Sequence, residues 1–215
     1  MFINMVNTVD GRTAVAGKAS GLGGEADRRV MRTLRSKADA VMIGGGTLRA
    51  EKLSLGLDAE DPRPRPIAVI STNTGDVPLA RNLLRDERQR VLVLLAEGAG
   101  KSAERRITDL AEVRYVPSTS GAIDLAEALK ILKSDYNVER LLVEAGPTLD
   151  QALISSNLAD ELFITLAPTL LGGPEPSAVI SDPLPKPHSL RLLSAHIARD
   201  ELFLRYAIGS EHQRN

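Results

Sequence analysis

The chain has 215 residues, of which 43% are hydrophobic and 26% charged, so it can bury an ordinary globular core. Its formal net charge of −1 argues against nucleic acid or an anionic membrane as the main partner. The absence of cysteine excludes disulfides and thiolate nucleophiles, and the three scattered histidines lead us to predict no metal site. No apolar run reaches the length of a membrane span and the start of the chain lacks a basic n-region, so we expect a cytoplasmic protein.

The first residues predict a strand followed by a glycine-rich loop. A strand over 2–8 would end at Asp10-Gly11, because this pair tolerates the positive φ of a tight turn. Residues 17–24 then hold four glycines and predict a mobile loop. Such a loop could cover an active site, or it could be a plain surface loop.

A helix is expected next, over 25–37. Glu25 and Asp27 lie in its first turn, where acids suit the helix dipole. One face carries Arg28, Arg32 and Arg35. This row of arginines suits a phosphate, and an ordinary solvated basic face explains it as well.

The most informative stretch runs from Ala38 to Arg49. A short apolar run predicts a buried strand, three glycines follow, and Thr47 begins a new helical pattern. Backbone N–H groups at a bare strand-to-helix turn can bind an anion, helped by the helix dipole. Gly45, Gly46 and Thr47 are therefore candidate anion-binding residues, although a tight turn without a ligand would look the same.

A second turn of this kind follows the strand predicted over 140–143. Glu144 ends that strand, and Gly146-Pro147-Thr148 leads into a helix from Leu149 to about Ser155. Proline is well suited to the first turn of a helix. The sequence therefore predicts two anion-binding turns.

Ser71 and Thr72 follow another buried strand, at 67–70, on the edge of the sheet where ligands sit in α/β folds, although turn formation alone would also explain these residues. The glycine turn at 44–49 does not match the Rossmann fingerprint, because Arg49 stands in place of the last glycine and no acid ends the next strand. Hydroxyl groups in place of that acid can donate to a 2′-phosphate, which points to NADP.

The rest of the chain predicts a mixed sheet. The remaining elements are strands over 91–95, 110–116 and 161–167, a helix over 123–132, and antiparallel strands over 190–196 and 201–208. Strands that alternate with helices, followed by strands alone, predict a single α/β domain over 1–215. Its sheet would be mainly parallel, with antiparallel C-terminal strands and helices on both faces.

Five motifs occur in one order along the chain. They are Asp10-Gly11-Arg12, Leu34-Arg35-x-x-x-Asp39-Ala40-Val41-Met42-Ile43-Gly44-x-Gly46-Thr47, Val143-Glu144-Ala145-Gly146-Pro147-Thr148-Leu149, Ala159-Asp160-Glu161-Leu162 and Pro168-x-Leu170-Leu171-Gly172-Gly173. The ordered set resembles the reductase domain of riboflavin biosynthesis, within the dihydrofolate-reductase-like superfamily, and covers nearly the whole chain. The resemblance implies NADPH-dependent reduction of a ribosylamino-pyrimidine 5′-phosphate to its ribitylamino product.

The resemblance also implies roles for individual residues. NADPH would be held by Gly45, Gly46, Thr47, Glu51, Ser71, Thr72, Gly146, Pro147, Thr148 and Leu149. The substrate would be contacted by Arg35, Ser20, Leu55 and Glu144. Glu144 and Asp10 are the catalytic candidates, although Glu144 could instead cap a helix and Asp10 could be a turn residue. An acid at the start of the first helix, Glu25 or Asp27, could also lie at the pocket rim, as in dihydrofolate reductases, or only cap that helix.

Two positions depart from the family pattern. Asp58 stands where the family has an arginine expected to grip the sugar phosphate, and the loop at 17–24 lacks the usual Trp-Ile-Thr. A related NADPH reductase of a pterin or another small heterocycle therefore stays open, as does a nucleotide-binding module without catalysis. The family commonly dimerises, so we expect a small-molecule substrate and a homodimer, with the C-terminal strands as its edge.

Overall fold

The structure, a computed structural model of the chain, describes residues 1–209 except 16, 20, 52–53, 58–60, 79–81, 85–87, 174–179 and 181–182. The chain divides into two compact units. The first unit combines Met1–Thr33 with Val143–Asn215, and the second is Leu34–Leu142. The expected single domain over 1–215 stays a prediction.

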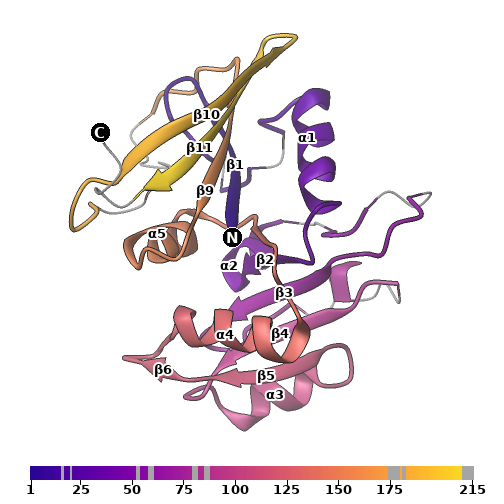
Figure 1. The fold of residues 1–215 in the computed structure, drawn as a ribbon. Helices are drawn as coiled ribbons and strands as arrows, with labels where there is room; N and C mark the ends of the chain where they lie inside the picture. Colours follow the sequence, from indigo (N-terminus) through magenta and orange to yellow (C-terminus); the bar gives the residue numbers. More distant parts are fainter. Residues whose placement is uncertain are drawn as a thin grey trace. The chain divides into compact units, whose positions relative to one another are not determined.

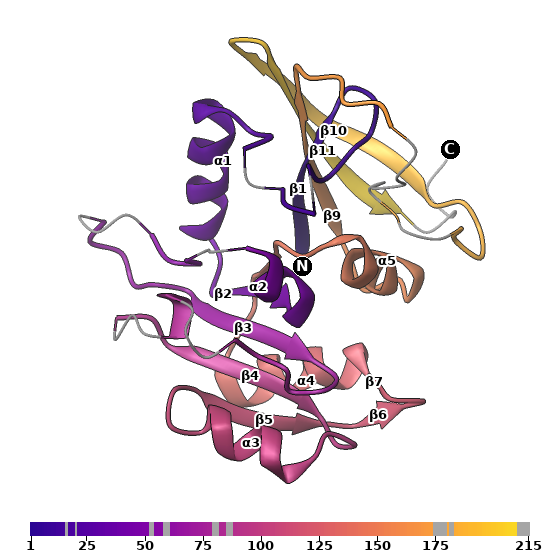
Figure 2. The same ribbon diagram turned by 180° about the vertical axis from the view of Figure 1, so that it is seen from behind.

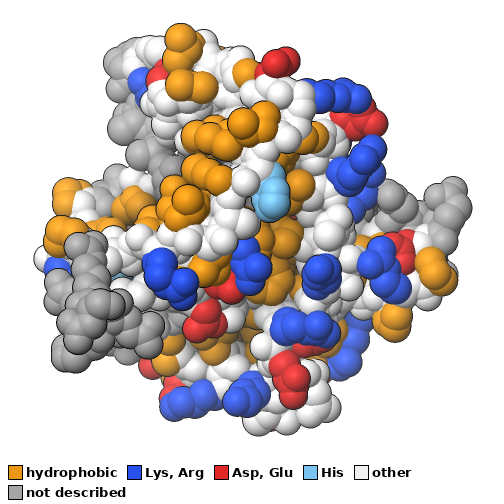
Figure 3. Space-filling model, turned by 45° about the horizontal axis from the view of Figure 1, so that its top comes forward, with side chains coloured by type: hydrophobic (Ala, Val, Ile, Leu, Met, Phe, Trp, Pro, Cys, Tyr) orange, Lys and Arg blue, Asp and Glu red, His pale blue; other side chains and the backbone are white. Residues whose placement is uncertain are grey.

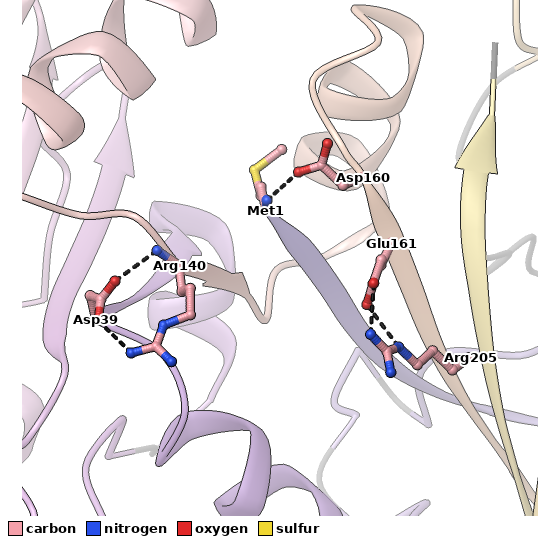
Figure 4. Close-up of polar contacts among 6 residues, drawn as sticks. All are labelled: Met1, Asp39, Arg140, Asp160, Glu161 and Arg205. Carbon is pink, nitrogen blue, oxygen red and sulfur yellow. Dashed lines mark hydrogen bonds and ion pairs between the residues drawn. The ribbon is translucent and has the colours of Figure 1, made fainter. Parts of the chain in front are cut away.

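The first unit is built on strands of mixed direction (Figure 1). They lie in the order β10-β11-β9-β1 and are β1 (Phe2–Thr8), β9 (Glu161–Ala167), β10 (Ser189–Ala198) and β11 (Glu201–Gly209). β9 is parallel to β1 and antiparallel to β11, and β11 is antiparallel to β10. Arg205 on β11 donates to both carboxylate oxygens of Glu161, at 2.9 and 2.7 Å, which ties the two strands together (Figure 4).

Two helices belong to this unit. They are α1 (Glu25–Arg35), of which the part up to Thr33 lies in the unit, and α5 (Pro147–Ser155). The apolar core includes Ile3 on β1, Leu153 on α5 and Ala167 on β9, all fully buried. The amino group of Met1 binds the carboxylate of Asp160 just before β9 (Figure 4). The glycine-rich segment 17–24 leads into α1, and residues 144–146, with one glycine, lead into α5.

The second unit has a parallel sheet in the order β2-β3-β4-β5. Its strands are β2 (Ala40–Gly44), β3 (Ile67–Thr72), β4 (Val91–Ala96) and β5 (Glu112–Val116), and Leu141 and Leu142 of β8 (Leu141–Val143) also belong to this unit. Its helices are α2 (Gly45–Ala50), α3 (Lys101–Ile107) and α4 (Leu125–Tyr136), with a short 3-10 turn at Asn82–Leu84 and a small hairpin of β6 (Ser118–Thr119) and β7 (Ala122–Ile123).

The helices of the second unit explain why its strand β4 is apolar without alternation. Figures 1 and 2 show α4 on one face of this sheet and α3 on the other. Every residue of β4 is buried, as expected for a parallel strand covered on both faces. Asp39, at the start of β2, accepts hydrogen bonds from the backbone N–H and the guanidinium of Arg140 at 2.7 and 3.2 Å (Figure 4).

The predicted fold class, a mixed and mainly parallel sheet with antiparallel C-terminal strands, is confirmed. The expected strands are all present, with small shifts of their ends. The predicted helices are present with shifted ends. The one expected from Thr47 begins at Gly45, and the one expected over 25–37 ends at Arg35. The one expected over 123–132 is Leu125–Tyr136, and the one expected from Leu149 begins at Pro147. Helix α3 was not predicted. No helix of the described ranges is long and apolar enough to cross a bilayer.

Candidate functional site

The first glycine turn joins β2 to α2 in the second unit. Gly44 is the N-cap and makes no side-chain cap hydrogen bond, and the first N–H groups of a helix have no acceptor within it. A Cβ at Gly45 would lie 3.2 Å from Oγ1 of Thr72, and Gly44 pairs with Ser71 across β2 and β3. The structure therefore brings this turn and the Ser71–Thr72 edge together, and Gly45 allows the close approach.

Arg49 lies at the same turn, although the sequence indicated it only as the residue that breaks a dinucleotide fingerprint. Its guanidinium would be 3.4 Å from a Cβ at Gly45, and Nη1 donates to the Asp76 carbonyl at 2.9 Å. The Asp76 carboxylate is 3.6 Å away. Helical spacing could have identified Arg49, because residues four apart share a face.

Arg35 is held inside the second unit. It is 6% exposed, and Nη1 donates to the carbonyls of Ser54 at 2.9 Å and Gly56 at 3.4 Å. These two carbonyls flank Leu55, which is fully buried, so the structure brings together Arg35 and Leu55. Glu51 is also buried, and its N–H donates to the Thr47 carbonyl at the end of α2. Two expected positions, Ser20 and Asp58, lie outside the described residues.

The predicted arginine row does not act as one surface, because Arg35 is buried while Arg28 and Arg32 are exposed. Arg28 Nη1 donates instead to the carbonyl of Gly23 at 3.3 Å. The phosphate interpretation of the row has no support from this geometry.

The second glycine turn belongs to the first unit. Gly146 is the extended N-cap of α5, Pro147 occupies the first turn as predicted, and the N–H of Leu149 donates to the Gly146 carbonyl at 3.1 Å. Thr148 is exposed at this turn, while Glu144 before it is half-buried. Gly146 makes no side-chain cap hydrogen bond. Because Pro147 has no N–H and the N–H of Leu149 is used, the N–H groups of Gly146 and Thr148 are the ones at this turn that could bind an anion.

Asp150 lies one turn into α5 and is 1% exposed. Both its carboxylate oxygens lack a hydrogen-bond partner among the described residues. Burial raises the pKa of this carboxyl to about 8, so at neutral pH it holds its proton. Nothing in the sequence indicates this, because an acid in the first turns of a helix is ordinary.

Asp10 serves the turn after β1. Its carboxylate accepts a hydrogen bond from the Thr8 hydroxyl at 2.5 Å and from the N–H of Gly172 at 2.7 Å. These bonds lower the pKa of Asp10 to about 2, with the Thr8 bond as the largest cause. Asp10 is therefore ionised at neutral pH and joins two distant turns.

Asp27 has a different environment from Glu25. Burial is the largest cause of a raised pKa at Asp27, and nearby Glu201 and Glu144 raise it further, while a side-chain hydrogen bond to Thr165 opposes them. Glu25 pairs with Arg199 at 2.9 Å on the surface. Asp27 is therefore a carboxyl whose surroundings favour its protonated form.

The first unit also contains a pocket of about 490 Å³ between α1 and the β10–β11 hairpin. Its lining is largely apolar with a basic rim and includes Val30, Phe163, Phe203, Arg29, His196 and Arg205. Of the candidate residues singled out from the sequence, Glu25 alone lines it. No cluster of potential metal ligands occurs within the described part of the chain.

Each glycine turn, taken by itself, fits a phosphate group. Backbone N–H groups at the start of a helix can bind phosphate oxygens, and at the first turn a Cβ on Gly45 would crowd the Thr72 hydroxyl. Hydroxyls and a guanidinium beside that turn, from Ser71, Thr72 and Arg49, suit an additional phosphate.

Comparison with known proteins gives a consistent result. A family model described as the RibD C-terminal domain matches residues 1–201. The 2,5-diamino-6-ribosylamino-4(3H)-pyrimidinone 5′-phosphate reductase of Archaeoglobus fulgidus is 32% identical over 183 residues, covering 80% of this chain and 82% of the relative. The reductase of the same name from Methanothermobacter thermautotrophicus is 27% identical over 216 residues and 97% of each chain.

Solved structures add the fold. Acinetobacter baumannii RibD has a TM-score of 0.78 and 25% identity, covering 97% of this chain and 58% of RibD. A pyrimidine reductase-like protein from Corynebacterium diphtheriae, at 18% identity, shows the same fold with a TM-score of 0.85 over 98% of this chain and 92% of that one. The match over residues 1–201 and the 32% identical relative show that the chain belongs to the RibD C-terminal domain family.

Proposed function

We propose that this chain is an NADPH-dependent reductase of riboflavin biosynthesis. Its substrate would be 5-amino-6-(5-phosphoribosylamino)uracil or the 2,5-diamino analogue, reduced to the ribitylamino form. The observation that carries the proposal is the family match over residues 1–201, joined to a relative of 32% identity that is named as such a reductase. We propose further that residues 1–215 act as one reductase domain.

NADPH is the proposed cofactor, and when bound it supplies the hydride. Its phosphates are assigned to the two bare turns and the edge of β3, with the residues Gly45, Gly46, Thr47, Glu51, Ser71, Thr72, Gly146, Pro147, Thr148 and Leu149. The hydroxyls of Ser71 and Thr72, together with Arg49, support NADPH over NADH, because they can donate to a 2′-phosphate.

The substrate is assigned to Arg35, Ser20, Leu55 and Glu144. Arg35 is buried, and its guanidinium donates hydrogen bonds to two backbone carbonyls beside Leu55. Its proposed role is therefore to fix the backbone around Leu55 as well as to place a positive charge near the substrate. Glu144 directly follows β8, where its carboxylate could accept hydrogen bonds from the amino groups of a pyrimidine.

The reaction needs one proton for each hydride. Opening of the ribose breaks the bond between C1′ and the ring oxygen, that oxygen takes a proton, and C1′ accepts the hydride. Asp27 is proposed as the proton donor, because burial and two neighbouring carboxylates raise its pKa and so favour its protonated form. Asp10 is ionised and fully engaged, so its proposed role is to hold the turn around Gly172.

A homodimer is part of the proposal. β10 is an edge strand of ten residues whose exposed apolar side chains are Leu190, Leu192, Leu193 and Ile197. In Figure 3, hydrophobic side chains form a band across the upper part of the face of the molecule that the figure shows. Long apolar edges invite pairing with another chain, which supports β10 as the dimer edge.

A second reaction has one observation in its favour. An acid on the first helix, half-buried and bonded to a threonine, would also suit protonation of a pterin such as dihydrofolate.

The experiment follows NADPH oxidation by absorbance with each substrate in turn. We expect turnover with the ribosylamino-pyrimidinone phosphate and little with dihydrofolate, and NADH should replace NADPH poorly. Turnover with dihydrofolate alone would favour the pterin reaction. If the protein does not bind NADPH, it is not an NADPH-dependent reductase, and the proposal is contradicted.

A further inference from the structure

The carboxylate of Glu201 reaches from the start of β11 to the start of α1. Oε1 accepts a hydrogen bond from the N–H of Gly24 at 2.6 Å, and Oε2 accepts one from the N–H of Asp27 at 3.3 Å. Glu201 is 5% exposed, so water competes little for these bonds. The N–H groups at the beginning of a helix have no partner within it, and a negative charge there also suits the helix dipole.

Two consecutive glycines let the loop approach these acids. A Cβ at Gly24 would lie 3.0 Å from Oε2 of Glu201, and a Cβ at Gly23 would overlap Oδ2 of Asp27. A side chain at either position would therefore displace a carboxylate. The end of the glycine-rich loop is packed directly on Glu201 and Asp27, so glycine is the residue that fits at positions 23 and 24 without moving either carboxylate.

The charged groups that act on Asp27 come from three segments. Glu201 on β11 and Glu144 after β8 carry like charges, and Arg28 on α1 carries the opposite charge. Thr165 on β9 makes a side-chain hydrogen bond to Asp27 and is 1% exposed. Asp27 therefore lies on a buried hydroxyl, with its own backbone N–H held by the neighbouring acid.

We propose that Glu201 is a positioning residue for Asp27: its carboxylate fixes the backbone at Gly24 and Asp27 and so holds the Asp27 carboxyl on Thr165. The negative charge of Glu201 also disfavours ionisation of Asp27, which keeps the proton on that carboxyl to higher pH. This inference rests on the proposed function, in which Asp27 donates the proton. Glu201 acts only through Asp27 and the loop.

The test compares Glu201→Gln with Asp200→Asn, a change to the neighbouring carboxylate in the exposed hairpin turn. Glutamine has one acceptor oxygen where glutamate has two, and no charge. We expect amide hydrogen exchange at Gly24 or Asp27 to rise about tenfold, as for the loss of one hydrogen bond to a charged group. NMR titration of the carboxyl carbons should show a lower Asp27 pKa, since a like charge has gone. Asp200→Asn should match the unchanged protein in both measurements.

Turnover gives a third readout. Because Asp27 must be protonated to act, the loss of kcat at high pH should begin at a lower pH in Glu201→Gln, while the affinity for NADPH stays the same. A change in thermal stability without any change in the Asp27 titration or in the pH profile would show a merely structural role and overturn the proposal.

Two further outcomes are distinguishable. If Glu201→Gln does not fold, Gly24→Ala, which crowds the same carboxylate, takes its place, and unchanged exchange at Asp27 in that variant would contradict the proposal. A folded enzyme with the expected exchange and titration changes but no turnover would contradict the proposed function and leave the placement of Asp27 intact.

Discussion

Thr47 is the residue whose hydroxyl can add a donor to the bare N–H groups of the first turn. It lies third in α2 and is half-buried. If the hydroxyl bonds a phosphate oxygen, Thr47→Val should weaken NADPH binding by roughly 1–2 kcal/mol, measured by fluorescence titration. Thr47→Ser, which keeps the hydroxyl, is the control. Equal affinities for the valine and serine variants would remove Thr47 from the cofactor site.

Asp150 should make folding stability depend on pH. The pKa of about 8 in the folded protein lies above the ordinary value of 3.8, so folding requires a bound proton at intermediate pH. Stability should therefore fall as pH rises from about 4 to about 8, by up to about 1.4 kcal/mol per pH unit. Asp150→Asn removes this dependence. The free energy of unfolding of the variant in urea, relative to that of the unchanged protein, should therefore increase over that pH range. An advantage that is the same at pH 5 and pH 8 would contradict the assigned pKa.

Residues differ in how far the sequence could reveal them. Arg49 was recoverable, because its spacing from Gly45 places both on one face of a helix. The contact of Glu201 with Gly24 and Asp27 was not, since it joins positions at opposite ends of the chain. Nor could the sequence show that Asp10 is fully engaged while Asp27 is not.

Elements follow a similar division. The buried strands were predictable, since β3 and β4 are continuous apolar runs bounded by polar residues. Helix α3 was missed, because Ile107 is the one buried apolar residue among its described side chains and most of the others are polar. Helix α2 begins at Gly45 because Gly44 already serves as its N-cap, whereas glycine propensity argued for a later start.

The β10 edge gives a prediction about assembly. Leu192 is 52% and Ile197 79% exposed on this strand, and a charge at these positions should prevent pairing of two copies. The double variant Leu192→Glu with Ile197→Glu should be a monomer by light scattering, whereas we expect the unchanged protein to be a dimer. Val9→Glu, at an exposed apolar residue away from β10, is the matched control. A double variant that stays dimeric would show that the interface lies elsewhere.

For the whole molecule, the family was predictable because five weak motifs occur in one order, and the matching family model covers residues 1–201. The division into two compact units was not, since no polar linker separates them and the first unit combines both ends of the chain. Each unit contains one of the two glycine turns to which we assign the NADPH phosphates.

A crystal structure with NADPH bound is the most direct measurement of this claim. We predict one NADPH whose phosphates accept hydrogen bonds from backbone N–H groups of both Gly45–Thr47 and Gly146–Leu149, with its 2′-phosphate beside Ser71, Thr72 and Arg49. A cofactor that contacts only one of the two turns, or that occupies the pocket between α1 and the β10–β11 hairpin, would contradict it.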